Sequence, residues 1–397
     1  MSGPLPFVDH MAGMGLNDGI TRRVPGVFLT SVRSDLSKKC FKIFGGIKMK
    51  KILLCSAALV GVAFAAAPAM AQVDVTVGGH TKNYLGWADN SGDTHDFDML
   101  RESELHFNAE GTADNGLTYG FHAELEADGG DDADTVEESY LYLASSLGRV
   151  NLGSEDGAAY LLQVAAPSAD SNVDGLRQYI NPFDFTGDFT SADGLDYDND
   201  LTGYSEKITY LSPNWSGLQF GLSYTPEIED ITDEDSDADI NSASGLAGFS
   251  EDVIGAAYEG AVRYEGTFNN VGYALGGGYT QGDSSDTNEW NIGADFDIGA
   301  FGLGAAYTEL EVDEGDVDVD TLVLGADYTT GPFQFGASYM NKDADDELEA
   351  DRYATGVVYT VTQGLTLRGS LQYVDVDTTG SDDDDKVAVL GGVQFNF

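Results

Sequence analysis

The sequence predicts an all-β fold, a sixteen-stranded antiparallel transmembrane β-barrel. Three observations predict this class. The composition combines 50 Gly with 20 Tyr and 20 Phe but only 9 Pro, and aromatic residues favour pleated strands whereas glycine favours tight turns. Apolar and polar residues alternate at period two through most of 72–397, with no convincing helical period. The connections between the alternating segments also alternate between short and long.

Sixteen segments show the alternation, an even number as in bacterial outer-membrane barrels. We expect strands at 73–87, 98–111, 117–127, 135–144, 148–154, 202–211, 216–225, 254–267, 270–280, 286–298, 301–311, 317–329, 332–341, 350–361, 364–374 and 386–397.

The last strand shows the pattern most clearly. It ends in "GGVQFNF", where Val393, Phe395 and Phe397 lie on one face. Lys386 and Gln394 lie on the other face. The apolar face continues to the final residue, whereas a soluble acidic domain usually ends in polar residues. Phe397 is therefore expected to face lipid in the aromatic belt at the membrane boundary.

The connections indicate which end of each strand faces which side of the membrane. Short turns are expected at Asp114-Asn115-Gly116, Asn269-Asn270, Gly299-Ala300, Gly331-Pro332 and Gln363-Gly364, and long ones at 88–97, 128–134, 155–201, 226–252 and 378–385. Short periplasmic turns and long acidic extracellular loops are the layout of an outer-membrane barrel. In lipid every backbone polar group needs a partner, so a sheet can cross only as a closed barrel.

A secretory leader is predicted inside the chain. From Met49, residues 49–71 contain a basic start, an apolar run and an Ala69-Met70-Ala71 cleavage site, so the mature protein is expected to begin at Gln72. The apolar run is shorter than the roughly 20 residues of a transmembrane helix. A lipoprotein site at Cys55 is disfavoured because Leu54 precedes it. Residues 1–48 are interpreted as an upstream extension in front of the true start.

Charge and cysteine content exclude several functions. Residues 72–397 contain 10 Lys or Arg and 65 Asp or Glu, a net charge of −55, and no Cys. This balance argues against nucleic-acid binding through phosphate contacts. It also leaves no disulfide or thiolate metal site in the barrel. No nucleophile–base pair, phosphate loop or distinct catalytic carboxylate pair is found, so no enzymatic activity is expected and no cofactor is required.

The region 72–397 resembles the general bacterial porins of Gram-negative bacteria, in particular the sixteen-stranded trimeric porins of alphaproteobacteria. The resemblance rests on "VTVGGHTKNYLGW", "GRVNLGSEDGAA", "KITYLSPNWSGLQFGLSYTP" and the terminal "GGVQFNF", in that order. It implies a homotrimer in the outer membrane that conducts small hydrophilic solutes by passive diffusion. It also implies that the outer-membrane assembly machinery reads Phe397, and that the third long loop folds into the barrel.

The segment 155–201 matches this constriction loop by position and is too long for an ordinary connection. The resemblance implies that acids on the loop face bases on the wall across the pore. The expected pore-lining residues are Lys82, Arg149, Lys207, Arg263 and Arg368 on the wall, with Glu155, Asp156, Asp170, Asp174 and Asp184 on the loop. Arg101 falls on the outward face by strict alternation, and Arg177 either faces the pore or fastens the loop. The acid excess predicts cation selectivity.

Metal binding remains an alternative at two kinds of place. The acidic runs 227–239 and 381–386 carry oxygen ligands suited to Ca²⁺, although solvated extracellular loops are the preferred interpretation. Divalent ions that bridge these loops to lipopolysaccharide are a further alternative. His80, His106 and His122 are expected on the lumen face of the first three strands, as wall residues rather than ligands of a transition metal.

Other functions remain open. A substrate-selective channel with binding residues in the loop is the first alternative to passive diffusion. A non-conducting adhesive or structural barrel is less consistent, since no domain is available as a plug. A soluble halophilic β-protein would expose its apolar band to water.

Overall fold

The computed structural model describes residues 73–89, 97–127, 136–169, 175–178, 180–183, 195–228, 255–283, 287–312, 317–344, 348–379 and 384–397. These residues lie in a compact unit, Pro68–Phe397. The predicted upstream extension and signal peptide lie outside the described residues. Among the described residues, no helix combines the length and apolar character that crossing a membrane would need.

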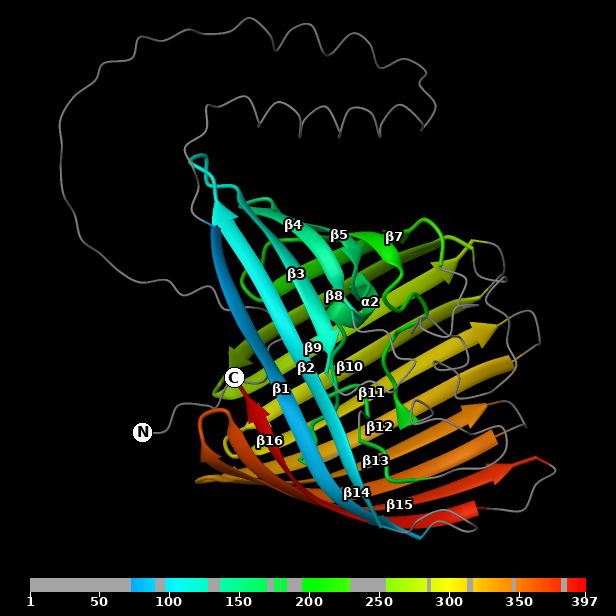
Figure 1. Ribbon diagram of the computed structural model, residues 1–397. Coiled ribbons are helices and arrows are strands. Elements are labelled where there is room, and N and C mark those ends of the chain that lie inside the picture. Colours follow the sequence, from blue (N-terminus) through cyan, green and yellow to red (C-terminus); the bar gives the residue numbers. More distant parts are fainter. Residues whose placement is uncertain are drawn as a thin grey trace, which may run out of the picture. The chain divides into compact units, whose positions relative to one another are not determined.

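Sixteen strands form one closed antiparallel barrel, as predicted, with each strand paired to its neighbours in the chain and β1 paired to β16 (Figure 1). The strands are β1 (Val73–Ala88), β2 (Phe97–Thr112), β3 (Thr118–Glu126), β4 (Ser139–Ser145), β5 (Gly148–Ser154), β6 (Glu206–Leu211), β7 (Leu218–Thr225), β8 (Ala257–Phe268), β9 (Val271–Gly282), β10 (Asn288–Ile298), β11 (Phe301–Val312), β12 (Val317–Thr330), β13 (Phe333–Ala344), β14 (Leu348–Thr362), β15 (Leu365–Thr378) and β16 (Asp384–Asn396). The helix α2 (Ala158–Leu161) lies in the long segment between β5 and β6.

The short turns follow from their residues. Asn269 and Asn270 join β8 to β9 with φ of 50° and 63°, the left-handed pair that a two-residue type I′ hairpin requires. Gly299, Gly331 and Gly364 also take positive φ in the turns that precede β11, β13 and β15. These turns set the register of the hairpins, because a slip by one residue would exchange the two faces of a strand.

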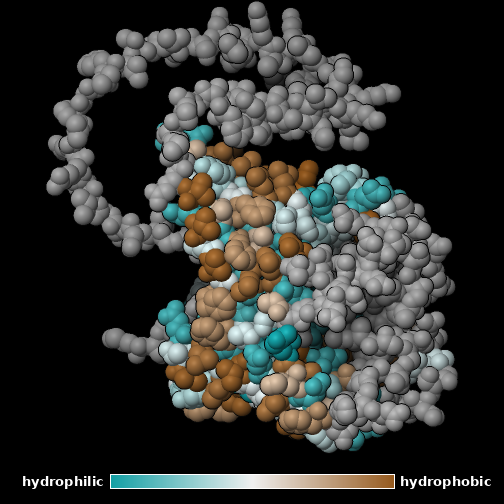
Figure 2. Space-filling view, viewed as in Figure 1, coloured by the Kyte–Doolittle hydropathy of each residue, from teal (hydrophilic) through white to brown (hydrophobic). Residues whose placement is uncertain are grey.

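The two faces of the strands separate as the alternation predicts. Leu85, Phe121, Leu222, Ile292 and Phe335 are exposed on the outside of the barrel, and Figure 2 shows apolar side chains across this outer surface. Strand side chains point alternately outward and inward, so the intervening residues face the barrel interior. An exposed apolar band of this size fits a lipid environment rather than water.

The end of the chain closes the barrel. Strand β16 ends at Asn396, but Phe397 continues the pairing: its N–H donates to the Gly79 carbonyl at 3.0 Å, and the Gly79 N–H donates to the Phe397 carbonyl at 3.2 Å. The Phe397 ring is 54% exposed and stacks on Phe395 with 5.5 Å between ring centroids. The expectation that this ring faces outward is therefore confirmed.

Two strand starts, those of β4 and β6, lie four residues later than predicted. Strand β6 begins at Glu206 rather than 202, because Gly203 N–H donates to Asp200 O at 2.9 Å and Ser205 N–H donates to Thr202 O at 3.1 Å, which turns the chain. Strand β4 begins at Ser139 rather than 135. In both cases the long connection extends further toward the strand than the alternation suggested.

The inward face is less uniformly polar than expected. An apolar cluster includes inward residues of β11–β16, among them Leu310, Val323, Met340 and Val374. Segments of the long 155–201 connection belong to the same cluster through Ala166, Phe183, Leu195, Tyr197 and Leu201. The inward face carries apolar as well as polar side chains here, because a segment folded inside the barrel covers them.

Candidate functional site: the constriction loop and the lumen wall

The described parts of segment 155–201 lie inside the barrel, and we call this segment the constriction loop. Helix α2 starts after Gly157 and contacts β6, β7, β8 and β9. Ala158 N–H donates to Ser223 Oγ at 2.8 Å, and Ala159 N–H donates to Glu259 Oε2 at 3.0 Å. Wall side chains thus accept hydrogen bonds from the first turn of this short helix, whose N–H groups have no partner within the helix.

A row of inward glycines seats the loop, and we call it the glycine groove. A Cβ added at Gly221 would lie 2.9 Å from the Ala158 Cβ, and one added at Gly276 would lie 2.7 Å from the Val164 Cγ2. The loop passes the wall strands in order from β7 to β13, so close approach continues along its length. The groove consists of Gly221, Gly276, Gly278, Gly293, Gly304, Gly325 and Gly336, opposite Ala158, Ala159, Val164, Pro167 and Ala169.

The far part of the loop reaches the strands that close the barrel. Ile180 is 2% exposed and packs with Tyr84 of β1 and Leu390 of β16. Pro182 lies opposite Gly86, where an added Cβ would be 3.4 Å from the proline Cβ. The loop therefore extends from the β7–β9 wall to the β1–β16 seam and occupies part of the cross-section, as Figure 1 shows for the green segment inside the barrel.

Arg177 fastens the loop to its own two ends. Its Nε lies 2.6 Å from Asp198 Oδ2, and its Nη2 lies 3.2 Å from Asp156 Oδ1 and 3.0 Å from Asp200 Oδ2. Its guanidinium lies over the rings of Tyr160 and Tyr204, at 4.7 and 5.3 Å from their centroids. A planar fork that meets several carboxylates and stacks on aromatic rings is a role for Arg rather than Lys. Of the two alternatives for Arg177, the structure supports the fastening role.

Two predicted wall bases contact the loop backbone. The Lys207 ammonium group donates to the carbonyls of Glu155 and Gly203, and the side chain is buried. Arg263 Nη1 donates to the Gln163 carbonyl at 2.8 Å, while its Nε pairs with Glu265. Lys207 is enclosed at the base of the loop, whereas the side chain of Arg263 stays 27% exposed.

The other predicted wall bases are inward but differ in their surroundings. Lys82 is 3% exposed, and its Nζ lies 2.8 Å from Glu102 Oε2. Arg149 Nε donates to Asn151 Oδ1 at 2.6 Å, and its guanidinium lies 4.1 Å from the ring centroid of Tyr142. Arg368 Nε donates to Thr366 Oγ1 at 3.3 Å. Arg101 is exposed between inward neighbours, so it points outward as the alternation predicts.

The loop acids divide into described and undescribed residues. Asp170, Asp174 and Asp184 lie outside the described residues, as do most of the acidic runs proposed for Ca²⁺. Burial raises the pKa of Glu155 to about 7, although two hydrogen bonds from Asn151 lower it. Burial likewise raises the pKa of Asp156 to about 6, against the opposing charge of Arg177. These two carboxylates are packed into the base of the loop.

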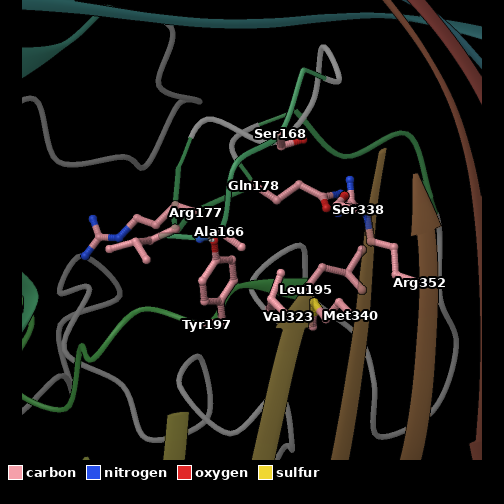
Figure 3. A pocket seen from close by; sticks show the side chains of 11 residues that line it. Ala166, Ser168, Arg177, Gln178, Leu195, Tyr197, Val323, Ser338, Met340 and Arg352 are labelled. Carbon is pink, nitrogen blue, oxygen red and sulfur yellow. Dashed lines mark hydrogen bonds between the residues drawn. The ribbon is translucent and has the colours of Figure 1, made fainter. Parts of the chain in front are cut away.

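A small pocket separates the middle of the loop from the wall. Its lining includes Ala166, Ser168, Gln178 and Tyr197 from the loop, with Ser338 and Arg352 from β13 and β14. Figure 3 shows the Gln178 side chain extended toward Ser338, while the Arg177 guanidinium points away from the pocket.

Two features were missed in the sequence. The first is the glycine groove, whose signal is glycine at inward positions of consecutive strands. The second is a pair of inward buried bases, Lys342 of β13 and Arg352 of β14, which lie with Lys386 of β16, a base that the sequence already placed on the inward face. Alternation places all three inward. Arg352 donates from Nε and Nη2 to Gln372 Oε1, each at 3.2 Å. Together with Lys82 and Arg368 they put five inward bases on the adjacent strands β13–β16 and β1.

Comparison with known proteins identifies the class. A family model described as Gram-negative porin matches residues 56–379. Similar solved structures include an anion-selective porin from Comamonas acidovorans, 18% identical with a TM-score of 0.54, and a mutant porin from Rhodopseudomonas blastica, 16% identical with a TM-score of 0.53. Each match covers 82% of this chain and 100% of the other. At this identity the structures show the shared barrel fold.

The chain belongs to the Gram-negative porin family, whose members are β-barrels of the outer membrane. The resemblance in the sequence is thereby confirmed, and the family and fold are those of non-enzymatic channels. Two uncharacterized proteins, from Rickettsia conorii and Rickettsia felis, are 26% identical over 137 and 132 residues. These matches cover 30% and 28% of this chain, and 31% and 29% of the relatives, so the chain spans about a third of the curated relatives' length.

Proposed function

We propose that the protein is a porin that allows passive diffusion of small hydrophilic solutes and ions across the outer membrane. The observation that carries this function is the constriction loop, seated in the glycine groove inside a closed barrel. A loop held against one arc of the wall narrows the lumen, and the inward charges on the remaining arc favour a hydrated path.

We further propose that the channel prefers cations. The net charge of −55 over 72–397 supports this preference. Three of the bases that could oppose it are closely paired: Lys82 contacts Glu102, Lys207 is enclosed by loop carbonyls, and Arg177 contacts three carboxylates. The Comamonas acidovorans porin is anion-selective, but at 18% identity it shares the fold alone.

Association into a homotrimer is proposed from the family resemblance, and the height of the wall supports association of copies through one arc. Strands β4, β5, β6 and β7 have 7, 7, 6 and 8 residues, whereas β1 and β2 have 16. At about 3.3 Å per residue and a tilt of about 40°, seven residues rise only about 18 Å, less than the roughly 25 Å apolar band of an outer-membrane barrel. A second copy that covers this low arc would shield it from lipid, and closed symmetry is the usual form of such assemblies. Contacts with lipopolysaccharide and with the assembly machinery through Phe397 stay predictions.

Planar-bilayer conductance across a KCl gradient tests the proposed function. We expect stepwise ohmic openings in groups of three and a reversal potential that favours K⁺. A potential that favours Cl⁻ would mean that the inward bases outweigh the acids, and the proposed selectivity would be wrong. A folded barrel that conducts no ions would overturn the channel function itself.

A further inference from the structure

Three histidines and several glutamates form a continuous row on the inward faces of β1, β2 and β3, and we call it the histidine row. The ring centroids of His80 and His106 are 6.3 Å apart, and those of His106 and His122 are 5.7 Å apart. Glu104 lies between the first two rings and Glu124 between the second two. The fastening of the loop does not use these residues.

The alternation of rings and carboxylates has a specific geometry. His80 Nδ1 lies 3.4 Å and His106 Nε2 lies 3.1 Å from the same oxygen, Glu104 Oε2. Ligands bound at about 2.0–2.2 Å in a tetrahedral site are about 3.3–3.6 Å apart, so these two separations are close to those of a ligand set. A second triad has similar separations: His106 Nδ1 lies 3.1 Å and His122 Nε2 lies 3.5 Å from Glu124 Oε2. In each triad the ligand atoms lie within 4.8 Å of one another.

We propose that His80, Glu104 and His106 form a binding site for a borderline divalent cation of the Zn²⁺ class in the lumen wall. Two imidazole nitrogens and one carboxylate oxygen form a ligand set that zinc accepts, with a fourth position left for water. Imidazole favours Zn²⁺ and its neighbours over Mg²⁺ and Ca²⁺, which prefer oxygen ligands. The site is separate from the acidic loops considered for Ca²⁺.

The surroundings distinguish this triad from its neighbour. When Nδ1 of His80 binds the cation, its Nε2–H donates to Glu102 Oε1 at 2.5 Å, and Glu102 is itself paired with Lys82. When Nε2 of His106 binds, its Nδ1–H faces Glu124 Oε2 at 3.1 Å. A carboxylate behind each ligating imidazole fixes its tautomer and raises its basicity.

The second triad lacks one of these supports. His122 Nε2 would bind, and its Nδ1 then faces the Asn108 amide oxygen at 2.8 Å, a neutral acceptor. A neutral imidazole has one lone-pair nitrogen, so His106 serves only one of the two triads at a time. The triad with two supporting carboxylates is therefore the site.

Burial leaves the site reachable from the lumen. His80 and His106 keep 14% and 16% of their side chains exposed, whereas the Glu104 side chain is 6% exposed. A cation entering from the aqueous side can therefore reach both rings. The desolvated Glu104 carboxylate at the back of the site strengthens the attraction of the site for that cation.

Calorimetric titration of the folded protein in detergent with ZnCl₂ tests the site without depending on conductance. We expect one Zn²⁺ per chain, with no matching heat for MgCl₂. His80→Asn and His106→Asn are expected to weaken binding at least tenfold, and Glu102→Gln by about tenfold through loss of the supporting carboxylate.

Two matched controls separate the site from a general effect of acidic wall charge. Glu110→Gln changes the same charge as Glu104→Gln on the same strand, but Glu110 contacts Tyr142 rather than the row. His122→Asn removes the third ring of the row. We expect both controls to bind Zn²⁺ as the parent does. The proposal is overturned by equal losses in Glu104→Gln and Glu110→Gln, by loss in His122→Asn with binding kept in His80→Asn, or by no Zn²⁺ binding to the folded protein.

Discussion

The glycine groove makes the seating of the constriction loop sensitive to a single methyl group. At Gly293 an added Cβ would contact the Val164 carbonyl oxygen and lie 3.0 Å from both the Val164 carbonyl carbon and Cβ. Backbone cannot rotate away as the end of a flexible side chain can, so Gly293→Ala must push the loop off the wall. Such overpacking costs about 1–3 kcal/mol, which raises the population of unseated loops by about 5- to 150-fold.

Trypsin measures this population directly. Arg177 is the single Lys or Arg between Glu155 and Leu201, and its guanidinium is enclosed by carboxylates and two tyrosine rings in the seated loop. Cleavage after Arg177 therefore requires the loop to leave its position. When opening is fast relative to cleavage, the rate of cutting follows the open population, so the same 5- to 150-fold increase is expected on a denaturing gel.

Gly391 provides the matched control, because an added Cβ there meets nothing within 4 Å. Gly391→Ala should be cut at the parent rate. If Gly293→Ala is also cut at the parent rate while its barrel is intact, the loop is not held by close approach to the groove, and the reasoning fails.

Three further perturbations address the loop and the barrel end. Arg177→Met leaves Asp156, Asp198 and Asp200 without their shared cation, and loss of one partner of a buried ion pair costs about 3–5 kcal/mol of stability. We expect noisier and larger single-channel currents. Unchanged currents would contradict the fastening role. Burial raises the pKa of Glu155 to about 7 in the folded protein, against about 4.5 when unfolded. The protonated carboxyl therefore contributes up to about 3 kcal/mol to the free energy of unfolding, in full below about pH 4.5, and this contribution is lost as the pH rises through about 7. Current noise should increase from pH 5 to pH 8, and less so in Glu155→Gln. Phe397→Ser keeps the backbone hydrogen bonds to Gly79 but removes the predicted assembly signal. The fraction of the protein recovered in outer membranes should fall. Equal recovery would contradict a role of Phe397 as assembly signal.

The sequence predicted the barrel well because lipid and water impose a period of two on every strand. Each predicted strand corresponds to one in the structure. The strand ends that differ most, by four residues, are the starts of β4 and β6 and the end of β15, and each adjoins a long connection. At β6 alternation carries no information, because Gly203 and Ser205 form turns with Asp200 and Thr202.

The site was predictable in position and less so in detail. Inward directions followed from alternation, but whether an inward base meets water or another side chain depends on residues distant in the chain. Lys207 illustrates this limit, since its carbonyl partners at Glu155 and Gly203 are placed by the folded loop. The histidine row is similar: His80, His106 and His122 were each expected inward, but the strand register that aligns them with Glu104 and Glu124 was not readable in advance.

The glycine groove also bears on the order in which the protein folds. The loop precedes β6, whereas the glycines that receive it lie on β7 and β9 to β13, later in the chain. The loop has no complete seat until those strands have paired, so we expect the barrel wall to assemble before the loop is fully seated. A newly inserted barrel is then expected to pass through an intermediate wider than the final pore.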